Sequence, residues 1–397
     1  MVGSRSSWTR GGQDRLRVLL FTNSVQMGGM EEHVRMLAEQ LPRERFEVEA
    51  VVPDEEATVA FTTQMRSAAD HLEQLTLDER HGVPRRIRDV LGLMRYGRSR
   101  RIDVAHLHST AYRGVIAAWL ALRAGGVRRI YVTEHLAPDG PVPIVPRTLR
   151  NAFSRAVTGI VCVSPKNFRA RAEWLTTPPE STVVVVNGID LDRFEAIPPE
   201  QTAQLRCELG IHAGAPVVGA AVRFEPEKGL DDLIEAMALV HTRHPDAILL
   251  MVGDGSLRDE LTAQAERLGI ADVTRFVGFQ KDTRPFYALM DVFVLPVPFG
   301  SASIGLLEAM AMRLAPVMTF GGEGEAVIHG ETGFCAEPND PTSIAEYVNL
   351  LLDDDELRER ISAAARRIVE TDFSSRRVAD TLSILYQHGP SALPLPS

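Results

Sequence analysis

Short apolar runs alternate with amphipathic stretches along this chain, and that alternation constrains the fold more than any other feature. Ten such runs lie at 15–21, 48–52, 104–108, 129–133, 159–164, 182–186, 216–222, 247–253, 291–297 and 315–320. Helical patterns separate them, for instance at 30–41, 111–124 and 230–244. Buried parallel strands are apolar on both faces and need helical crossovers between them. The pattern therefore predicts an α/β protein with two doubly wound parallel sheets.

A polar, proline-containing run at 192–202 interrupts the alternation and marks the predicted domain boundary. The expected organisation is a flexible leader at 1–14, domains at 15–195 and 196–372, and a closing helix at 373–389. The 397 residues suit two domains of ordinary size. The leader has no apolar core of a secretion signal, and no apolar run approaches the ~20 residues of a membrane span.

Charge is distributed unevenly between the two halves. Residues 1–195 hold 27 basic and 23 acidic side chains, whereas residues 196–397 hold 16 and 30. An acidic chain without clustered aromatic and basic segments argues against a nucleic-acid partner. The three cysteines are distant in sequence, which favours reduced thiols and a cytoplasmic location: Cys162, Cys207 and Cys335.

Two cations follow the apolar run at 216–222. Arg223 and Lys228 are five residues apart around a turn that contains Pro226, just ahead of a helical pattern. Arginine binds a phosphate through a planar fork and lysine binds it as a point charge, so the pair could clamp a diphosphate. The alternative interpretation is a solvated loop.

The run at 291–297 is followed by glycine and serine residues and then by a helix expected to begin near Ser303. Free backbone N–H groups at a helix start suit an anion, and Ser303 could cap that helix. Glu308 would lie little more than one turn into the helix, where its carboxylate could accept hydrogen bonds from a diol such as ribose. The alternative is that Glu308 caps or solvates the helix.

Further candidates follow strands of the first half. Gly28 and Gly29 lie between the first strand and first helix, where glycine permits close approach of a ligand. His135 ends the run at 129–133 and is a candidate for polar contact or proton chemistry, although a histidine there can also be structural. His106 and His108 alternate on one strand without a third ligand at useful spacing, so no metal site is predicted.

The segment 85–101 carries seven arginines and one aspartate. Its apolar residues Ile87, Val90, Leu91 and Met94 recur at helical spacing. A basic amphipathic helix can contact an anionic membrane surface. Packing of the apolar stripe on the sheet is the favoured alternative.

Taken in order, the motifs resemble those of retaining GT-B glycosyltransferases of family 4. The resemblance covers nearly the whole chain and is carried by MGGMEEHVRMLA, DVAHLHS, VTEH, VSPKNF, VVNGIDLDRF, VRFEPEKG, VGDGSLRDEL, LLEAMAMRLAPV and HGETGF. It implies two Rossmann-like domains facing across a cleft, with the acceptor on the first domain and a nucleoside diphosphate-sugar on the second. It also implies that the closing helix at 373–389 crosses back to the first domain.

The resemblance assigns roles to the candidates. Arg223 and Lys228 would neutralise the diphosphate leaving group, Glu308 would bind the ribose, and His135 would lie near the donor sugar. Gly28 and Gly29 would let their loop approach the reaction centre. Further donor contacts would come from the loop and helix start that precede Glu308, at Gly300, Ser301, Ser303 and Ile304. Such a site needs neither a metal nor a cofactor beyond the donor itself.

One position departs from the family pattern. The family has a glutamate eight residues before the one that matches Glu308, and this chain has Gly300 there. Retaining transfer in this fold is described as front-face substitution assisted by the diphosphate, so the chemistry does not strictly need that carboxylate. The expectation is an active hexosyltransferase with a UDP-sugar donor favoured over GDP or ADP sugars. Its acceptor would be a glycan, a lipid-linked molecule or a small molecule. The alternative is a weak or inactive protein that binds a nucleotide or glycan.

Overall fold

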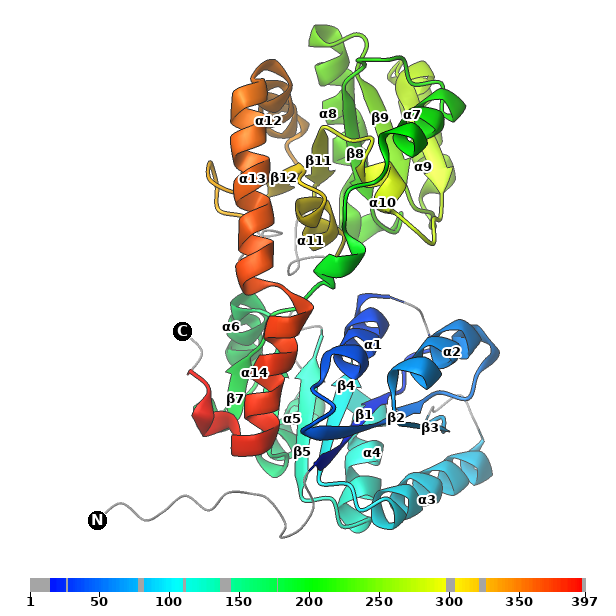
Figure 1. Cartoon of the computed structure of the whole chain (residues 1–397), viewed down its shortest axis with the longest axis vertical. Coiled ribbons are helices and arrows are strands. Elements are labelled where there is room, and N and C mark those ends of the chain that lie inside the picture. The colour runs from blue at the N-terminus through cyan, green and yellow to red at the C-terminus, as the bar shows by residue number, and fades with distance from the viewer. Residues whose placement is uncertain are drawn as a thin grey trace, which may run out of the picture. The chain divides into compact units, whose positions relative to one another are not determined.

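The computed structural model describes residues 15–25, 28–77, 82–109, 112–135, 144–176, 178–297, 304–320 and 326–394. The chain divides into two compact units (Figure 1). Unit 1 contains the chain up to Gly188 and again from Ser375, and unit 2 contains Ile189–Ser374. The division falls at 188/189, where Ile189 forms a bridge with Ser374 and donates its N–H to the Phe373 carbonyl. The sequence placed it at 195/196.

Unit 1 is built on a seven-stranded parallel sheet in the order β3-β2-β1-β4-β5-β6-β7. Its strands are β1 (Leu16–Thr22), β2 (Phe46–Val52), β3 (His71–Gln74), β4 (Val104–Ser109), β5 (Arg129–Glu134), β6 (Gly159–Cys162) and β7 (Thr182–Val184). The strand order reverses between β1 and β4. Ligands of doubly wound sheets bind beyond the carboxyl ends of the strands at such a reversal.

Helices cover both faces of this sheet (Figure 1). One face packs on α1 (Gly29–Gln40), α2 (Val59–Ala68) and α14 (Ser375–His388). The other packs on α3 (Val83–Ser99), α4 (Tyr112–Ala124) and α5 (Ile144–Ala156), and α6 (Pro165–Trp174) follows β6. The last helix of the chain, α14, thus belongs to the core of the first unit.

Unit 2 contains a six-stranded parallel sheet in the order β10-β9-β8-β11-β12-β13, which reverses between β8 and β11. Its strands are β8 (Val217–Ala221), β9 (Ile248–Val252), β10 (Thr274–Gly278), β11 (Val292–Leu295), β12 (Ala315–Thr319) and β13 (Phe334–Ala336). Its helices are α7 (Pro199–Glu208), α8 (Leu230–Arg243), α9 (Arg258–Arg267), α10 (Arg284–Tyr287), α11 (Ile304–Ala311), α12 (Pro341–Asp353) and α13 (Asp355–Asp372).

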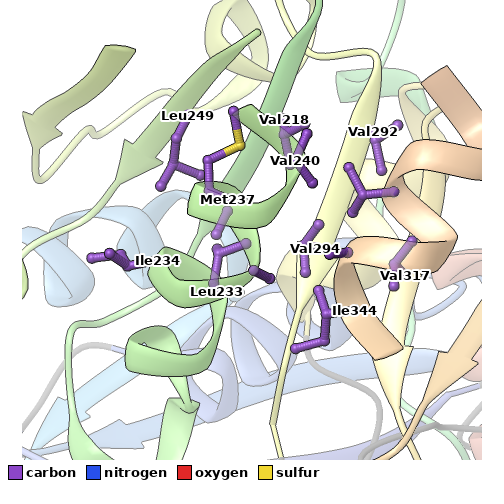
Figure 2. Packing of buried hydrophobic residues seen from close by; sticks show 14 of the residues in the cluster. Val218, Leu233, Ile234, Met237, Val240, Leu249, Val292, Val294, Val317 and Ile344 are labelled. Atoms are coloured by element: carbon purple, nitrogen blue, oxygen red, sulfur yellow. The ribbon is translucent and has the colours of Figure 1, made fainter. Parts of the chain in front are cut away.

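The core of unit 2 lies between its sheet and the helices α8, α9 and α12. Figure 2 shows Leu233 and Met237 of α8 and Ile344 of α12 close to the strand residues Val218 and Val294. All five side chains are essentially inaccessible to solvent. The apolar runs of the sequence therefore serve as the buried strands that the alternation predicts.

The predicted strands all appear, but three edge strands are missing from the prediction. These are β3, β10 and β13, which end the two sheets. β3 and β10 are partly solvated and lack a continuous apolar run, and β13 is buried but only three residues long. The helical sequence between β13 and α14 forms two helices, α12 and α13, because Asp354 leaves the helical conformation and its carboxylate caps α13 by accepting the Leu357 N–H at 2.9 Å.

The favoured prediction for α3 is confirmed only in part, because Val90 and Met94 pack against the core but the rest of the predicted stripe does not. Leu93 and Gly97 are buried, whereas Ile87 and Leu91 are 55% and 37% exposed. A Cβ on Gly97 would lie 3.3 Å from Leu122 and Val127, so this glycine lets α3 approach α4 closely. Close approach through Gly97 decides which face of the helix is buried.

Candidate functional site

The two cations predicted from the sequence lie at the strand-order reversal of unit 2. Arg223 and Lys228 follow β8, and Glu308 lies on α11, which follows β11. β8 and β11 are neighbouring parallel strands, with Val218 beside Val292. Their carboxyl ends meet at one edge of the sheet, so the segments that carry the cations and the carboxylate leave the sheet at the same edge.

The two cations in the loop after β8 differ in their exposure to solvent. The Arg223 side chain is 66% exposed and reaches Glu227 only at 4.0 Å. Lys228 is half-buried in a short 3-10 turn, Pro226–Lys228, and burial lowers the pKa of its ammonium group, as does nearby Arg223. Gly229 then adopts a left-handed conformation with φ 62° and leads into α8. A partly desolvated ammonium beside a free guanidinium favours an anionic ligand.

The loop after β9 packs against the loop after β8 and holds it in place. Gly253 has φ 138°, and a Cβ there would lie 1.9 Å from the Val222 carbonyl oxygen. A Cβ on Gly255 would lie 2.4 Å from the Phe224 carbonyl oxygen. The Phe224 N–H donates to the Asp254 carbonyl at 2.9 Å. Glycine at both positions is therefore required for the contact that holds the Arg223 loop in place.

Glu308 is half-buried and held by two hydroxyl groups from one short segment. The Tyr287 hydroxyl donates to Glu308 Oε2 at 3.0 Å, and the Thr283 hydroxyl donates to the same oxygen at 3.3 Å. Tyr287 is buried on α10, and burial together with Glu308 raises its pKa well above the ordinary value. The tyrosine therefore remains protonated and acts as a hydrogen-bond donor that orients the carboxylate.

Part of the predicted donor site lies outside the described residues: Gly300, Ser301 and Ser303. Ile304, the remaining predicted contact, is the first residue of α11 and is half-buried.

In unit 1 the predicted glycines lie at the start of α1, the helix that follows β1. Gly28 is extended, with φ −172°, and Gly29 is the first residue of α1. A Cβ on Gly28 would meet only Glu31 Oε2, at an ordinary 3.5 Å. Among the described residues, nothing therefore demands glycine at position 28. Burial raises the pKa of the Glu31 carboxyl, which lies at this helix start.

Four buried histidines come together at the carboxyl edge of unit 1. His108 Nδ1 lies 3.3 Å from His135 Nε2, and the ring of His33 lies 5.5 Å and 5.3 Å from those two rings. His106 bonds to the Tyr386 hydroxyl at 2.5 Å and the Thr133 hydroxyl at 2.6 Å.

Burial lowers the pKa of His33 to about 4 and that of His106 to about 3, and it lowers the pKa of both His108 and His135 well below the ordinary value. The four rings are therefore neutral at pH 7. His135 can donate or accept a hydrogen bond, but it supplies no charge.

A buried ion pair anchors the chain next to His135. Arg171 on α6 donates from Nη1 to both carboxylate oxygens of Glu134 at 2.7 Å, and from Nη2 to the Ser154 hydroxyl. Neither charged side chain is more than 4% exposed. The His135 N–H donates to the Ser109 carbonyl at 3.1 Å, which extends the β4–β5 pairing. These contacts fix where His135 leaves the sheet.

One group among the described residues has the spacing of metal ligands: Glu47, Glu49 and His71. These glutamates already pair with arginines, Glu47 with Arg17 at 2.9 Å and Glu49 with Arg100 at 2.8 Å. The arginines neutralise the charge that would attract a cation, so this group stabilises the pairing of β2 with the edge strand β3. The described helices also include none with the length and apolar character of a membrane span.

Sequence reasoning missed the residues that hold the candidates in place: Tyr287, Thr283, His33 and Arg171. Tyr287 lies in an apolar stretch that reads as core, and Arg171 lies in a helix without a distinctive motif. The alternation of His106 and His108 was a usable signal, but His33 and His135 join them only through the fold.

Comparisons with known proteins identify the family to which this chain belongs. Residues 27–193 match the model described as Glycosyltransferase Family 4, and residues 202–368 match Glycosyl transferases group 1. The chain is 30% identical over 308 residues to a GDP-mannose-dependent alpha-(1-6)-phosphatidylinositol monomannoside mannosyltransferase of Mycolicibacterium smegmatis, covering 72% of this chain and 79% of that protein. This chain is a group 1 glycosyltransferase. It is also 28% identical over 290 residues to the N-acetyl-alpha-D-glucosaminyl L-malate synthase of Bacillus anthracis, covering 72% and 74% of the two chains.

Solved structures confirm the GT-B fold of this glycosyltransferase. A glycosyltransferase from Rickettsia africae superposes with a TM-score of 0.81 at 18% identity, covering 94% of this chain and 98% of that one. Anabaena HepE, crystallised with UDP, gives a TM-score of 0.79 at 22% identity over 93% and 98% of the two chains. These structures confirm the fold expected from the motifs, and the family match confirms the transferase activity.

Proposed function

We propose that this enzyme transfers a hexose, with retention, from a nucleoside diphosphate-sugar to a glycan, lipid-linked or small-molecule acceptor. One observation carries the proposal: two cations and an oriented carboxylate follow the two strands that flank the reversal of the second sheet. A nucleoside diphosphate presents two anionic groups and a ribose diol, which matches that set. UDP is the favoured carrier, as in the HepE complex.

In the proposed reaction, the bond between the sugar and the diphosphate oxygen breaks while the acceptor oxygen attacks from the same face. Negative charge grows on the diphosphate as this bond breaks, and Arg223 and Lys228 stabilise it. Glu308 accepts hydrogen bonds from the ribose hydroxyls. The proposal requires neither a metal nor a carboxylate at Gly300, because the departing diphosphate itself receives the acceptor proton.

The first experiment measures release of free nucleoside diphosphate from UDP-, GDP- and ADP-sugars without added metal. Wild type is compared with Arg223→Ala/Lys228→Ala and with Arg360→Ala/Arg367→Ala, whose exposed arginines lie on α13. We expect release from one carrier, at least ~100-fold slower in the first variant and unchanged in the second. Equal turnover in both variants would refute the assigned cations. Binding of the nucleotide without release from any donor would favour the non-catalytic alternative.

A second experiment tests the orientation of Glu308. Tyr287→Phe removes a hydrogen bond to a charged group, which contributes about 1.5–3 kcal/mol. We expect nucleoside diphosphate binding to weaken by at least ~10-fold, with uridine affected as strongly as UDP because the ribose contact is shared. A loss confined to UDP would place the effect at the phosphates instead and contradict the ribose assignment.

We also propose a cytoplasmic location at the inner face of the membrane. Cys162, Cys207 and Cys335 are free thiols, which suits a reducing compartment. The arginine-rich segment 85–101 provides the candidate contact with the membrane.

A further inference from the structure

The helices on the two faces of the unit 1 sheet differ sharply in charge. On one face, α3, α4 and α5 carry ten arginines and a single acid, Asp89. Asp89 is buried and pairs with Arg88 at 2.9 Å. On the other face, α1, α2 and α14 carry four arginines and four acids. The charge of this domain is therefore concentrated on one layer of helices.

Three of the α3 arginines are exposed and have no acidic partner. No carboxylate lies within 4.0 Å of the guanidinium groups of Arg86, Arg95 or Arg98 in the described chain. Arginines of the same segment that support the fold are paired, as Arg100 is with Glu49 at 2.8 Å. The unpaired arginines are free to bind an external anionic surface.

Apolar side chains are interleaved with these arginines. Ile87, Leu91, Arg95 and Arg98 follow one another at intervals of four, four and three residues, so they lie along one stripe of α3. On α4, which packs beside α3, Leu120 is 55% exposed. A soluble polyanion would bind the arginines but gain nothing from exposed isoleucine and leucine. An anionic bilayer binds both, because it combines charged headgroups with an apolar interior.

The residues of this stripe extend along α3 from one edge of the sheet to the other. α3 leads from β3 into β4 of a parallel sheet, so its first turns lie at the carboxyl edge and its last turns at the opposite edge. The carboxyl edge is where Gly28 and His135 lie. Arg86 and Ile87 therefore lie toward the edge that carries those candidates, whereas Arg95 and Arg98 lie toward the opposite edge.

We propose that the face formed by α3 and α4 docks on an anionic lipid bilayer, with Ile87, Leu91 and Leu120 entering the interface and Arg86, Arg95 and Arg98 contacting the headgroups. The proposal deepens, and rests on, the membrane location proposed above for segment 85–101, and it does not depend on the donor. It narrows the acceptor classes to those found at a membrane surface.

The test is sedimentation of the full-length enzyme with vesicles of phosphatidylcholine alone or mixed with phosphatidylglycerol, at physiological salt. We expect binding only to the anionic vesicles. Arg86→Glu/Arg95→Glu/Arg98→Glu should lower the partition coefficient by at least ~100-fold. Ile87→Ser/Leu91→Ser should lower it by at least ~10-fold at the same net charge as wild type.

Matched controls alter exposed residues away from this face. Arg360→Glu/Arg367→Glu/Arg376→Glu makes the same charge change on α13 and α14, and Leu239→Ser/Leu350→Ser removes two leucines exposed to a similar degree. Both controls should bind like wild type. Donor turnover in solution is measured for every variant, so a failed donor assay is distinguished from failed docking.

Three results would overturn the proposal. The first is that the wild-type enzyme, shown to be folded by its thermal unfolding transition, does not bind anionic vesicles. The second is equal loss in the charge control, which would indicate a general charge effect. The third is loss in the arginine variant alone, with Ile87→Ser/Leu91→Ser still bound and heparin competing fully, which would identify a soluble polyanion as the partner.

Discussion

The buried pair of Glu134 and Arg171 gives the sharpest stability prediction. Arg171 is fully buried and Glu134 is nearly so, and two contacts of 2.7 Å join them. Arg171→Met fills the space of the aliphatic stem but leaves a carboxylate in the core without its main partner. Breaking a buried pair in this way costs about 3–5 kcal/mol, because the remaining charge has lost its hydration and its counter-charge. We expect a loss of that size in urea unfolding at pH 8.

The double variant Glu134→Leu/Arg171→Met separates charge from packing. Removing both charges should recover most of the loss, to within about 1 kcal/mol of wild type, because no buried charge then remains. Burial raises the pKa of the Glu134 carboxyl. In Arg171→Met a raised carboxyl pKa means that the folded state gains stability as pH falls, so its deficit should shrink between pH 8 and pH 5. A single variant that loses under about 1 kcal/mol, or a double variant as unstable as the single, would refute this reasoning.

Two further predictions concern His33 and Gly253. Because His33 has a folded pKa of about 4, below its unfolded value, its neutral form stabilises the fold above pH 6.5 and that contribution is lost as pH falls toward 4. His33→Gln should therefore flatten the acid limb of the unfolding free energy by about 1.4 kcal/mol per pH unit, and an unchanged slope would show that His33 is not held neutral. Gly253→Ala should destabilise the enzyme by at least about 3 kcal/mol and weaken UDP binding, since its Cβ would lie 1.9 Å from Val222 O. Gly269→Ala, with positive φ but open space, should cost only about 1–2 kcal/mol and leave UDP binding intact.

Some strands and helices could be predicted from the sequence, and others could not. Strands such as β8 and β11 are buried on both sides, so their apolar runs were unmistakable, and their order located Arg223, Lys228 and Glu308. β3, with the sequence HLEQ, is an edge strand, and its residues carry no apolar signal. For α3 the predicted stripe was half right: Val90 and Met94 pack against the core, but Ile87 and Leu91 are exposed, because periodicity does not reveal that Gly97 permits the closest packing.

The sequence by itself determined the α/β class, two sheets, the glycosyltransferase family and the residues that chemistry would need at the strand ends. Those properties follow from local order along the chain, which composition and spacing record directly. Only the tertiary structure decided which groups support them: Tyr287 behind Glu308, Arg171 behind the strand that carries Glu134, and His33 beside His108 and His135. These contacts join residues from separate helices and strands, and their effects on pKa and orientation arise from burial, which exists only after the chain has folded.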